Sequence, residues 1–145
     1  MVSRKTLDTG QYVFETIDGK LVITYLKNIR YAVGVMSKTK TGGHFLILDF
    51  DDVKRKKVLD VVKRLKRECD FVVYYKTEHG YHVITNKRVR FREFAIKALQ
   101  LGADSVWVGI GLKRGYWFLE VKRKELLPEL EKRGFRLMVI ERTEV

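Results

Sequence analysis

The chain has 145 residues, of which 46% are hydrophobic and 33% are charged. This length and balance predict one globular domain with its own core and exclude a disordered polyelectrolyte. There is no run of 18 or more apolar residues and no charged-then-apolar leader, so we expect a soluble, cytoplasmic protein. The single cysteine, Cys69, excludes an internal disulfide and a multi-cysteine zinc site.

The net charge is +12, from 30 Lys and Arg against 18 Asp and Glu. An excess of this size favours polyanionic partners, and nucleic acid is the commonest of these. The alternative is the solvated surface of a hyperthermophile protein, which fits the low count of two Asn and two Gln. Because that alternative explains the amount of charge but not its sign, we favour a nucleic-acid partner.

The first part of the chain, residues 1–43, is predicted to be a β unit. Two strand-like runs, 11–16 and 20–26, flank Asp18-Gly19, which is a strong hairpin signal. A third strand is expected near 30–36. The following stretch, 37–43, is rich in Lys, Thr and Gly but lacks the spacing of a Walker loop, so a flexible connector is the favoured interpretation.

The stretch from His44 to Asp52 organises the rest of the chain. Large apolar residues predict a buried strand, which ends in three carboxylates within four positions. Since strand side chains alternate, Asp49 and Asp51 share one face and lie about 7 Å apart along the chain. Two like charges repel each other, and a divalent cation such as Mg²⁺ would relieve that repulsion. We expect an active site here, whereas Asp52 is better placed to cap the next helix.

Residues 44–112 are predicted to form a core of the order β-α-β-β-α-β. The strand at the acidic stretch is followed by an amphipathic helix with a stripe of buried valines and leucine, then by two strands, a second helix and a fourth strand. The expected ranges after the first strand are 53–68 (stripe Val58, Val61, Val62 and Leu65), 71–76, 81–85, 91–102 and 105–112. This order is that of ferredoxin-like or RRM-like folds, in which the first and third strands are neighbours. His82, on the third strand, is therefore expected beside Asp49 and Asp51, and Asp104 opens the fourth strand.

The last part, residues 113–145, is predicted to be a β-α-β extension. A hairpin turn is expected at Lys113-Arg114-Gly115, followed by a strand at 116–121. The helix at 124–133 contains the only proline, Pro128, so it is expected to begin near that residue. A closing strand follows at 135–140. The fold class is then α+β: an RRM-like core with an N-terminal β-hairpin and this extension, in one domain over residues 1–145.

The combination of motifs resembles the archaeo-eukaryotic primase superfamily, also called primase-polymerases, over roughly residues 45–120. In that family an apolar strand ends in Asp-x-Asp, as Leu46-Ile47-Leu48-Asp49-Phe50-Asp51 does. A small or hydroxyl residue and glycines precede a His in the second motif, which Thr77-Glu78-His79-Gly80-Tyr81-His82 matches. The third motif is an acidic residue further along, for which Asp104 is the best match. The spacings of 31 residues from Asp51 to His82 and 22 from His82 to Asp104 suit the family.

The resemblance implies a metal-dependent nucleotidyltransferase with an RRM-like catalytic fold. Asp49, Asp51 and Asp104 would hold two Mg²⁺ or Mn²⁺ ions, and His82 would contact the incoming nucleoside triphosphate. Lys113 or Arg114 would assist at the nucleotide. The implied partners are a DNA or RNA template with its primer, and a partner replication protein, because the chain is short for an active primase.

Three other interpretations remain open. Asp49-Phe50-Asp51 also fits the haloacid-dehalogenase phosphatase pattern, but that fold needs a later acidic pair that this chain does not offer. A non-catalytic or reduced RRM-like nucleic-acid-binding module of a replication or repair system would explain the charge, although the carboxylates would repel phosphate. A rolling-circle nuclease needs a His-apolar-His pattern, which puts both histidines on one face of a strand. His79 and His82 are three positions apart and do not share a strand face.

Overall fold

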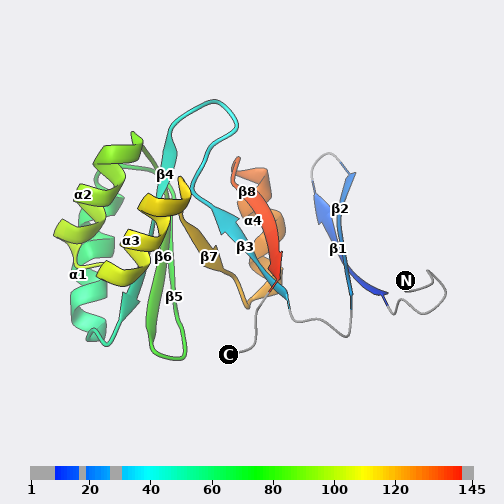
Figure 1. Ribbon diagram of the computed structural model, residues 1–145, viewed down its shortest axis with the longest axis horizontal. Coiled ribbons are helices and arrows are strands. Elements are labelled where there is room, and N and C mark those ends of the chain that lie inside the picture. Colours follow the sequence, from blue (N-terminus) through cyan, green and yellow to red (C-terminus); the bar gives the residue numbers. More distant parts are fainter. Residues whose placement is uncertain (1–8, 17–18, 27–30, 142–145) are drawn as a thin grey trace. The chain divides into compact units, whose positions relative to one another are not determined.

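The computed structural model describes residues 9–16, 19–26 and 31–141, which form an α+β fold (Figure 1). Three sheets have the strand orders β1-β2, β7-β3-β8 and β4-β6-β5. In chain order the elements are β1 (Thr9–Thr16), β2 (Gly19–Leu26), β3 (Tyr31–Met36), β4 (His44–Asp51), α1 (Arg55–Lys66), β5 (Val72–Lys76), β6 (Gly80–Val89), α2 (Phe91–Leu101), α3 (Ser105–Arg114), β7 (Phe118–Glu120), η2 (Lys124–Leu126), α4 (Leu127–Lys132) and β8 (Arg136–Glu141). No helix among these residues is long and apolar enough to cross a membrane.

By its contacts the chain divides into two compact units. The first comprises Met1–Val35 and Glu120–Val145, and the second comprises Met36–Leu119. All the site residues expected from the sequence lie in the second unit. The expectation that the whole chain acts as a single domain stays a prediction.

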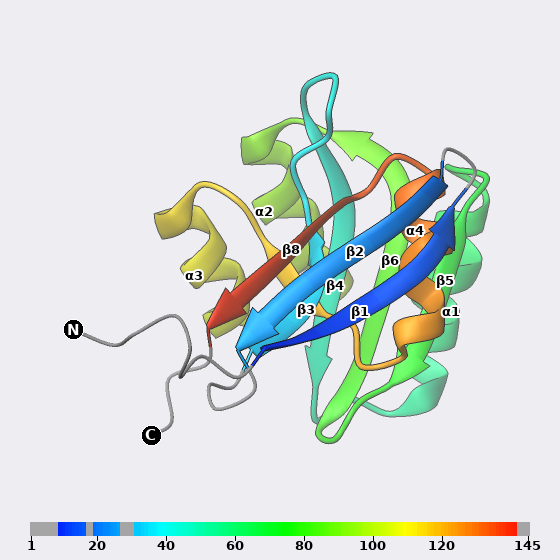
Figure 2. The same cartoon turned by 90° about the vertical axis from the view of Figure 1, so that its right-hand side faces the viewer.

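In the first unit, β1 and β2 form the antiparallel hairpin that the sequence predicts (Figure 2). Thr16 pairs with Gly19, and Asp18, which the sequence pattern places in the turn, lies outside the described residues. The expected strands near 30–36 and 135–140 are present as β3 and β8. α4 contacts both β1 and β8, and Pro128 stands in its first turn, which confirms that the helix starts near the proline.

In the second unit, helices α1 and α2 pack against one face of the sheet β4-β6-β5 (Figure 1). Leu46, Leu48 and Phe50 of β4 are completely buried, in keeping with their shared strand face. The helix side of this interface is the predicted stripe of Val58, Val61, Val62 and Leu65, all buried. The pairing of β4 with β6 confirms the expectation that the first and third strands of this region are neighbours.

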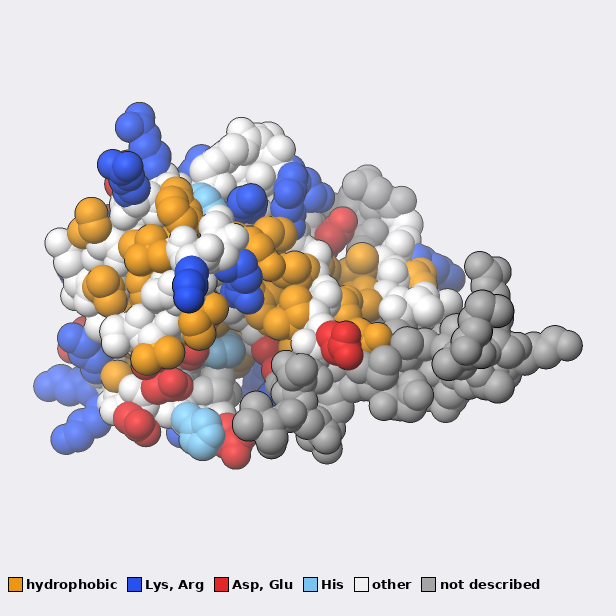
Figure 3. All heavy atoms as spheres, viewed as in Figure 1, with side chains coloured by type: hydrophobic (Ala, Val, Ile, Leu, Met, Phe, Trp, Pro, Cys, Tyr) orange, Lys and Arg blue, Asp and Glu red, His pale blue; other side chains and the backbone are white. Residues whose placement is uncertain are grey.

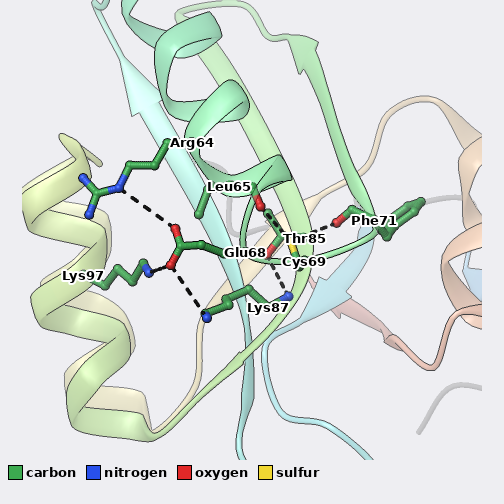
Figure 4. Close-up of polar contacts among 8 residues, drawn as sticks. All are labelled: Arg64, Leu65, Glu68, Cys69, Phe71, Thr85, Lys87 and Lys97. Atoms are coloured by element: carbon green, nitrogen blue, oxygen red, sulfur yellow. Dashed lines mark hydrogen bonds and ion pairs between the residues drawn. The ribbon is translucent and has the colours of Figure 1, made fainter.

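An ionic cluster lies at the C-terminal end of α1 (Figure 4). Glu68 accepts a hydrogen bond from Lys97 of α2, and its carboxylate lies 3.7 Å from Lys87 Nζ on β6. The thiol of Cys69 donates to the carbonyl of Leu65 at 3.2 Å. Glu68 therefore ties the end of α1 to both α2 and β6, and Cys69 lies half-buried shortly before β5.

The predicted strand at 105–112 and the hairpin turn after it are wrong, because Ser105–Arg114 forms the helix α3. Asp104 caps this helix by accepting a hydrogen bond from the backbone N–H of Trp107 at 2.9 Å. Gly115 ends it in a left-handed conformation with a φ of 95°. The fourth strand of the expected RRM-like core is therefore a helix, and the strand expected at 116–121 is shortened to β7.

Aromatic rings fill the space between α2 and α3. Trp117 is fully buried and stacks on Phe94 with ring centroids 3.8 Å apart. Its indole N–H donates to the carbonyl of Val108 at 3.0 Å. Gly111 leaves room for this ring, since a Cβ there would lie 2.1 Å from the indole. His44 packs against the edge of Trp117 and bonds the buried hydroxyl of Ser37 through Nδ1 at 2.8 Å.

The connector 37–43 is hydrogen-bonded to β6, and its flexibility stays a prediction. Arg88 of β6 donates to the hydroxyl of Thr41 and to the carbonyl of Gly42, both at 2.7 Å. Thr39 is buried and its hydroxyl bonds the carbonyl of Gly42 as well. The sequence did not reveal this because the guanidinium comes from a residue more than 40 positions away.

Candidate active site

Asp49 of β4 and His82 of β6 face each other on two neighbouring strands of the second unit. They are direct partners in the antiparallel register of β4 and β6. His82 Nε2 lies 3.3 Å from Asp49 Oδ1, and the two side chains are only 14% and 19% exposed. This confirms the predicted proximity of the histidine to the acidic strand end, and it follows from strand pairing because opposed side chains share one face.

Tyr75 completes a line of three polar side chains on the same face. It is the register partner of His82 on β5, and its hydroxyl lies 3.0 Å from His82 Nδ1. Burial raises the pKa of the Tyr75 phenol above its ordinary value, and the charge of Asp49 raises it further. Sequence reasoning missed this residue. The hairpin between β5 and β6 turns at 77–79, and its register alone would have placed Tyr75 opposite His82.

Asp51 ends β4 on the exposed rim of the site. Its Cα partner is Gly80, the first residue of β6. The pKa of Asp51 is raised, first by burial and then by the negative charges of Asp49 and Asp104. The three carboxylates predicted from the sequence therefore lie within electrostatic reach of one another. The charge of His79, in the turn before β6, acts in the opposite direction on this pKa.

Asp104 reaches the site through a helix cap and not through a strand. Its backbone N–H donates to the carbonyl of Asp49 at 2.8 Å, which fixes the start of α3 beside the end of β4. Its Oδ2 accepts from the backbone of Trp107. The side chain therefore has the structural role of an N-cap, and its second oxygen is left for another partner.

Asp52 does not cap α1, which corrects the sequence expectation. The N-cap is Lys54, whose side chain makes no capping hydrogen bond, and the helix begins at Arg55. Asp52 instead has a positive φ of 52° and donates its backbone N–H to the carbonyl of His79 at 2.9 Å. Aspartate tolerates this left-handed conformation better than most residues, and here it turns the chain out of β4 toward the helix.

Lys113 and Arg114 are not brought to the carboxylates by α3. They occupy the last turn of this helix, whereas Asp104 caps its first turn. At a rise of about 1.5 Å per residue the two ends lie roughly 14 Å apart along the helix axis. The guanidinium of Arg114 lies over the ring of Tyr116 at 4.5 Å. A nucleotide-binding role for either residue stays a prediction.

The outer edge of the site carries an acidic surface. Figure 3 shows acidic side chains and a histidine gathered below the sheet of the second unit. The exposed residues of this kind are Asp51, at the end of β4, and Asp52, Glu78 and His79, in the connections after β4 and β5. The negative charge of this surface is opposite in sign to the net charge of the chain, which is +12. These carboxylates repel one another, and a bound cation would relieve that repulsion.

The donor set suits a hard divalent cation such as Mg²⁺ or Mn²⁺. Within the described residues no three His, Cys, Asp or Glu side chains are grouped closely enough to hold a metal ion by themselves. Magnesium commonly takes only one or two carboxylates and completes its shell with water and substrate phosphates. Asp49 and Asp51, with Asp104 beside them, meet that requirement.

Comparisons with known proteins add no relative. No family model matches the chain, and no curated protein or solved structure shows significant similarity to it.

Proposed function

We propose that the protein is a metal-dependent nucleotidyltransferase of the primase-polymerase type, which joins nucleoside triphosphates on a nucleic-acid template. The observation that carries this proposal is the pairing of Asp49 with His82 at the end of β4, with Asp51 and Asp104 within electrostatic reach. A histidine and acidic residues on adjoining strand ends are the arrangement that the motifs of this family imply.

In this proposal Asp49, Asp51 and Asp104 hold Mg²⁺ or Mn²⁺ through their carboxylate oxygens. When bound, the ions would supply activation of the attacking hydroxyl and neutralisation of the leaving pyrophosphate. The hydroxyl oxygen forms a bond to the α-phosphorus as the bond to pyrophosphate breaks, and the hydroxyl proton passes to solvent. His82 presents Nε2, the nitrogen next to Asp49, as a donor to the triphosphate.

The fold gives this proposal partial support. The sheet order β4-β6-β5 corresponds to three strands of an RRM-like core in their expected positions. The helix α3 takes the place of the fourth strand, so the RRM-like assignment rests on three strands and two helices. Asp104 still lies beside Asp49, because its backbone bond to that residue does not depend on a strand.

The alternative is a non-catalytic or reduced nucleic-acid-binding module that works with a partner replication protein. The net charge of +12 favours a nucleic-acid partner in either case. The acidic strand end beside His82 favours the catalytic function, because carboxylates on the binding face would repel phosphate unless a cation is bound.

A primed-template extension assay tests the proposal. The full chain is incubated with Mg²⁺ or Mn²⁺ and labelled dNTPs or NTPs, and the wild type is compared with Asp49→Asn and Asp51→Asn. Asp60→Asn is the matched control, since Asp60 is an exposed carboxylate on α1. We expect the wild type and the control to extend the primer. The extension rate of both site variants should fall at least about 100-fold, because removing a group that stabilises charge in the transition state has an effect of this size.

His82→Ala is expected to raise the KM for the triphosphate with a smaller effect on kcat, since its proposed contact is with the substrate. Extension that survives in Asp49→Asn or Asp51→Asn would refute the assignment of the site. No extension by the wild type, together with salt-dependent binding of single-stranded DNA, would leave the binding module as the function.

A further inference from the structure

We infer that Tyr75 is a positioning residue, which binds Nδ1 of His82 and so holds the imidazole in the tautomer that carries its proton on Nε2. The functional consequence rests on the proposed function: His82 would then present its Nε2–H as a donor to the triphosphate. The structural part concerns the three side chains alone and can be tested without any reaction. Tyr75 belongs to none of the motifs that point to the site.

Both ring nitrogens of His82 have a partner, and the two partners come from different strands. Tyr75 of β5 lies 3.0 Å from Nδ1, and Asp49 of β4 lies 3.3 Å from Nε2. His82 on β6 stands between them as the register partner of each. The two rings also meet edge to face, with centroids 5.3 Å apart and an interplanar angle of 73°. The imidazole is thus held from both sides within one sheet.

The chemistry of the partners fixes the tautomer of a neutral imidazole. Nε2 lies 3.3 Å from a carboxylate oxygen of Asp49, and a carboxylate can only accept hydrogen bonds, so its charge favours a proton on this nitrogen over a lone pair. Nδ1 then has a lone pair and needs a donor, and the phenol of Tyr75 supplies it because tyrosine is protonated at neutral pH. Without this hydroxyl the ring can rotate or exchange tautomers, and the donor at Nε2 is no longer held toward the acidic residues.

The competing explanation is that Tyr75 only packs against His82. Tyr75→Phe separates the two, because it keeps the ring contact and removes the hydroxyl. Tyr74→Phe is a matched control in the same strand, because neighbouring residues point to opposite faces and the Tyr74 hydroxyl interacts with Arg55. Thermal unfolding of both variants shows whether either substitution disturbs the fold.

The first measurement is nitrogen NMR of the His82 ring in mildly alkaline buffer, where imidazoles are neutral. We expect a protonated Nε2 and a hydrogen-bonded, unprotonated Nδ1 in the wild type. The Nδ1 signal should shift in Tyr75→Phe and stay in place in Tyr74→Phe. A proton on Nδ1 in the wild type, or unchanged ring signals in Tyr75→Phe, would overturn the inference.

The second measurement is calorimetric binding of Mg²⁺-dATP in a double-mutant cycle. Tyr75→Phe should weaken binding by roughly 2- to 12-fold, the equivalent of one neutral hydrogen bond, and should have no further effect in a His82→Ala background. An equal loss in that background would show that Tyr75 acts independently of His82 and would refute positioning. If the wild type binds neither Mg²⁺-dATP nor Mg²⁺-ATP, the proposed function fails, and the NMR result alone decides the role of Tyr75.

Discussion

Gly80 is the position at which the site is most sensitive to a small change in volume. It opens β6 directly opposite Asp51, and the two strands approach so closely there that no side chain fits. A Cβ at Gly80 would lie 1.8 Å from the carbonyl oxygen of Phe50. This contact is with backbone, so Gly80→Ala must push β4 and β6 apart at the end that carries Asp51.

The cost follows from the hydrogen bonds around that end. Thr77 N–H donates to the carbonyl of Gly80 at 2.8 Å, and Asp52 N–H donates to the carbonyl of His79 at 2.9 Å. The N–H of Gly80 also donates to the hydroxyl of Thr77 at 3.1 Å. Three bonds at a net 0.5–1.5 kcal/mol each give a destabilisation of about 1.5–4.5 kcal/mol for Gly80→Ala.

Urea unfolding of the full chain measures this effect. Gly109→Ala is the matched control, because Gly109 is exposed on α3 and a Cβ there meets nothing within 4 Å. That control should gain about 0.5–1 kcal/mol from the loss of a helical glycine. A free energy of unfolding for Gly80→Ala within about 0.5 kcal/mol of the wild type would refute the close approach of β4 and β6.

Three further predictions concern the carboxylates, the buried histidine and α3. Because the pKa of Asp51 is raised, its ionised form opposes folding at neutral pH. Asp51→Asn should therefore increase the free energy of unfolding by up to about 1 kcal/mol, measured by urea titration in the presence of EDTA. Burial, followed by the charge of Lys38, lowers the pKa of His44 below 6.5, so stability should fall as pH drops below 6.5, by at most about 1.4 kcal/mol per pH unit. A His44→Gln variant with the same pH slope would contradict this assignment. Gly111→Ala should cost about 1–3 kcal/mol because its Cβ meets the ring of Trp117, and equal stability of this variant and the wild type would argue against α3 as a helix packed on that ring.

The pairing of Asp49 with His82 was predictable, because the alternation of side chains along a strand and the order of strands and helices along the chain can both be inferred from the sequence. The apolar run before Asp49 and Asp51 specifies a buried strand, and the β-α-β-β order makes β4 and β6 neighbours. The histidine motif then puts His82 on the acidic face. What was missed is the contribution of β5, because Tyr75 is recognised as the partner of His82 only once the register of the hairpin between β5 and β6 is drawn.

The error at α3 has a physical cause. Ser105 to Leu112 alternates valines and isoleucine with other residues, a pattern typical of a strand. In the structure the helix buries Val108 and Gly111 and leaves Val106 and Ile110 exposed, so hydrophobicity did not mark its inner face. The signals that identify it are at its ends: Asp104 as the N-cap and Gly115 after the last turn.

The central claim, that the carboxylates at the end of β4 form a cation site, is tested most directly by titrating Mn²⁺ into the isotope-labelled chain and following its amide NMR signals. Paramagnetic Mn²⁺ broadens signals near its binding site. We predict that the amides of Asp49, Asp51 and Asp104 broaden first, that those of Lys113 and Arg114 at the far end of α3 broaden later, and that Asp51→Asn weakens the effect. Uniform broadening over the surface, or the same titration in Asp51→Asn, would contradict a metal centre at this position.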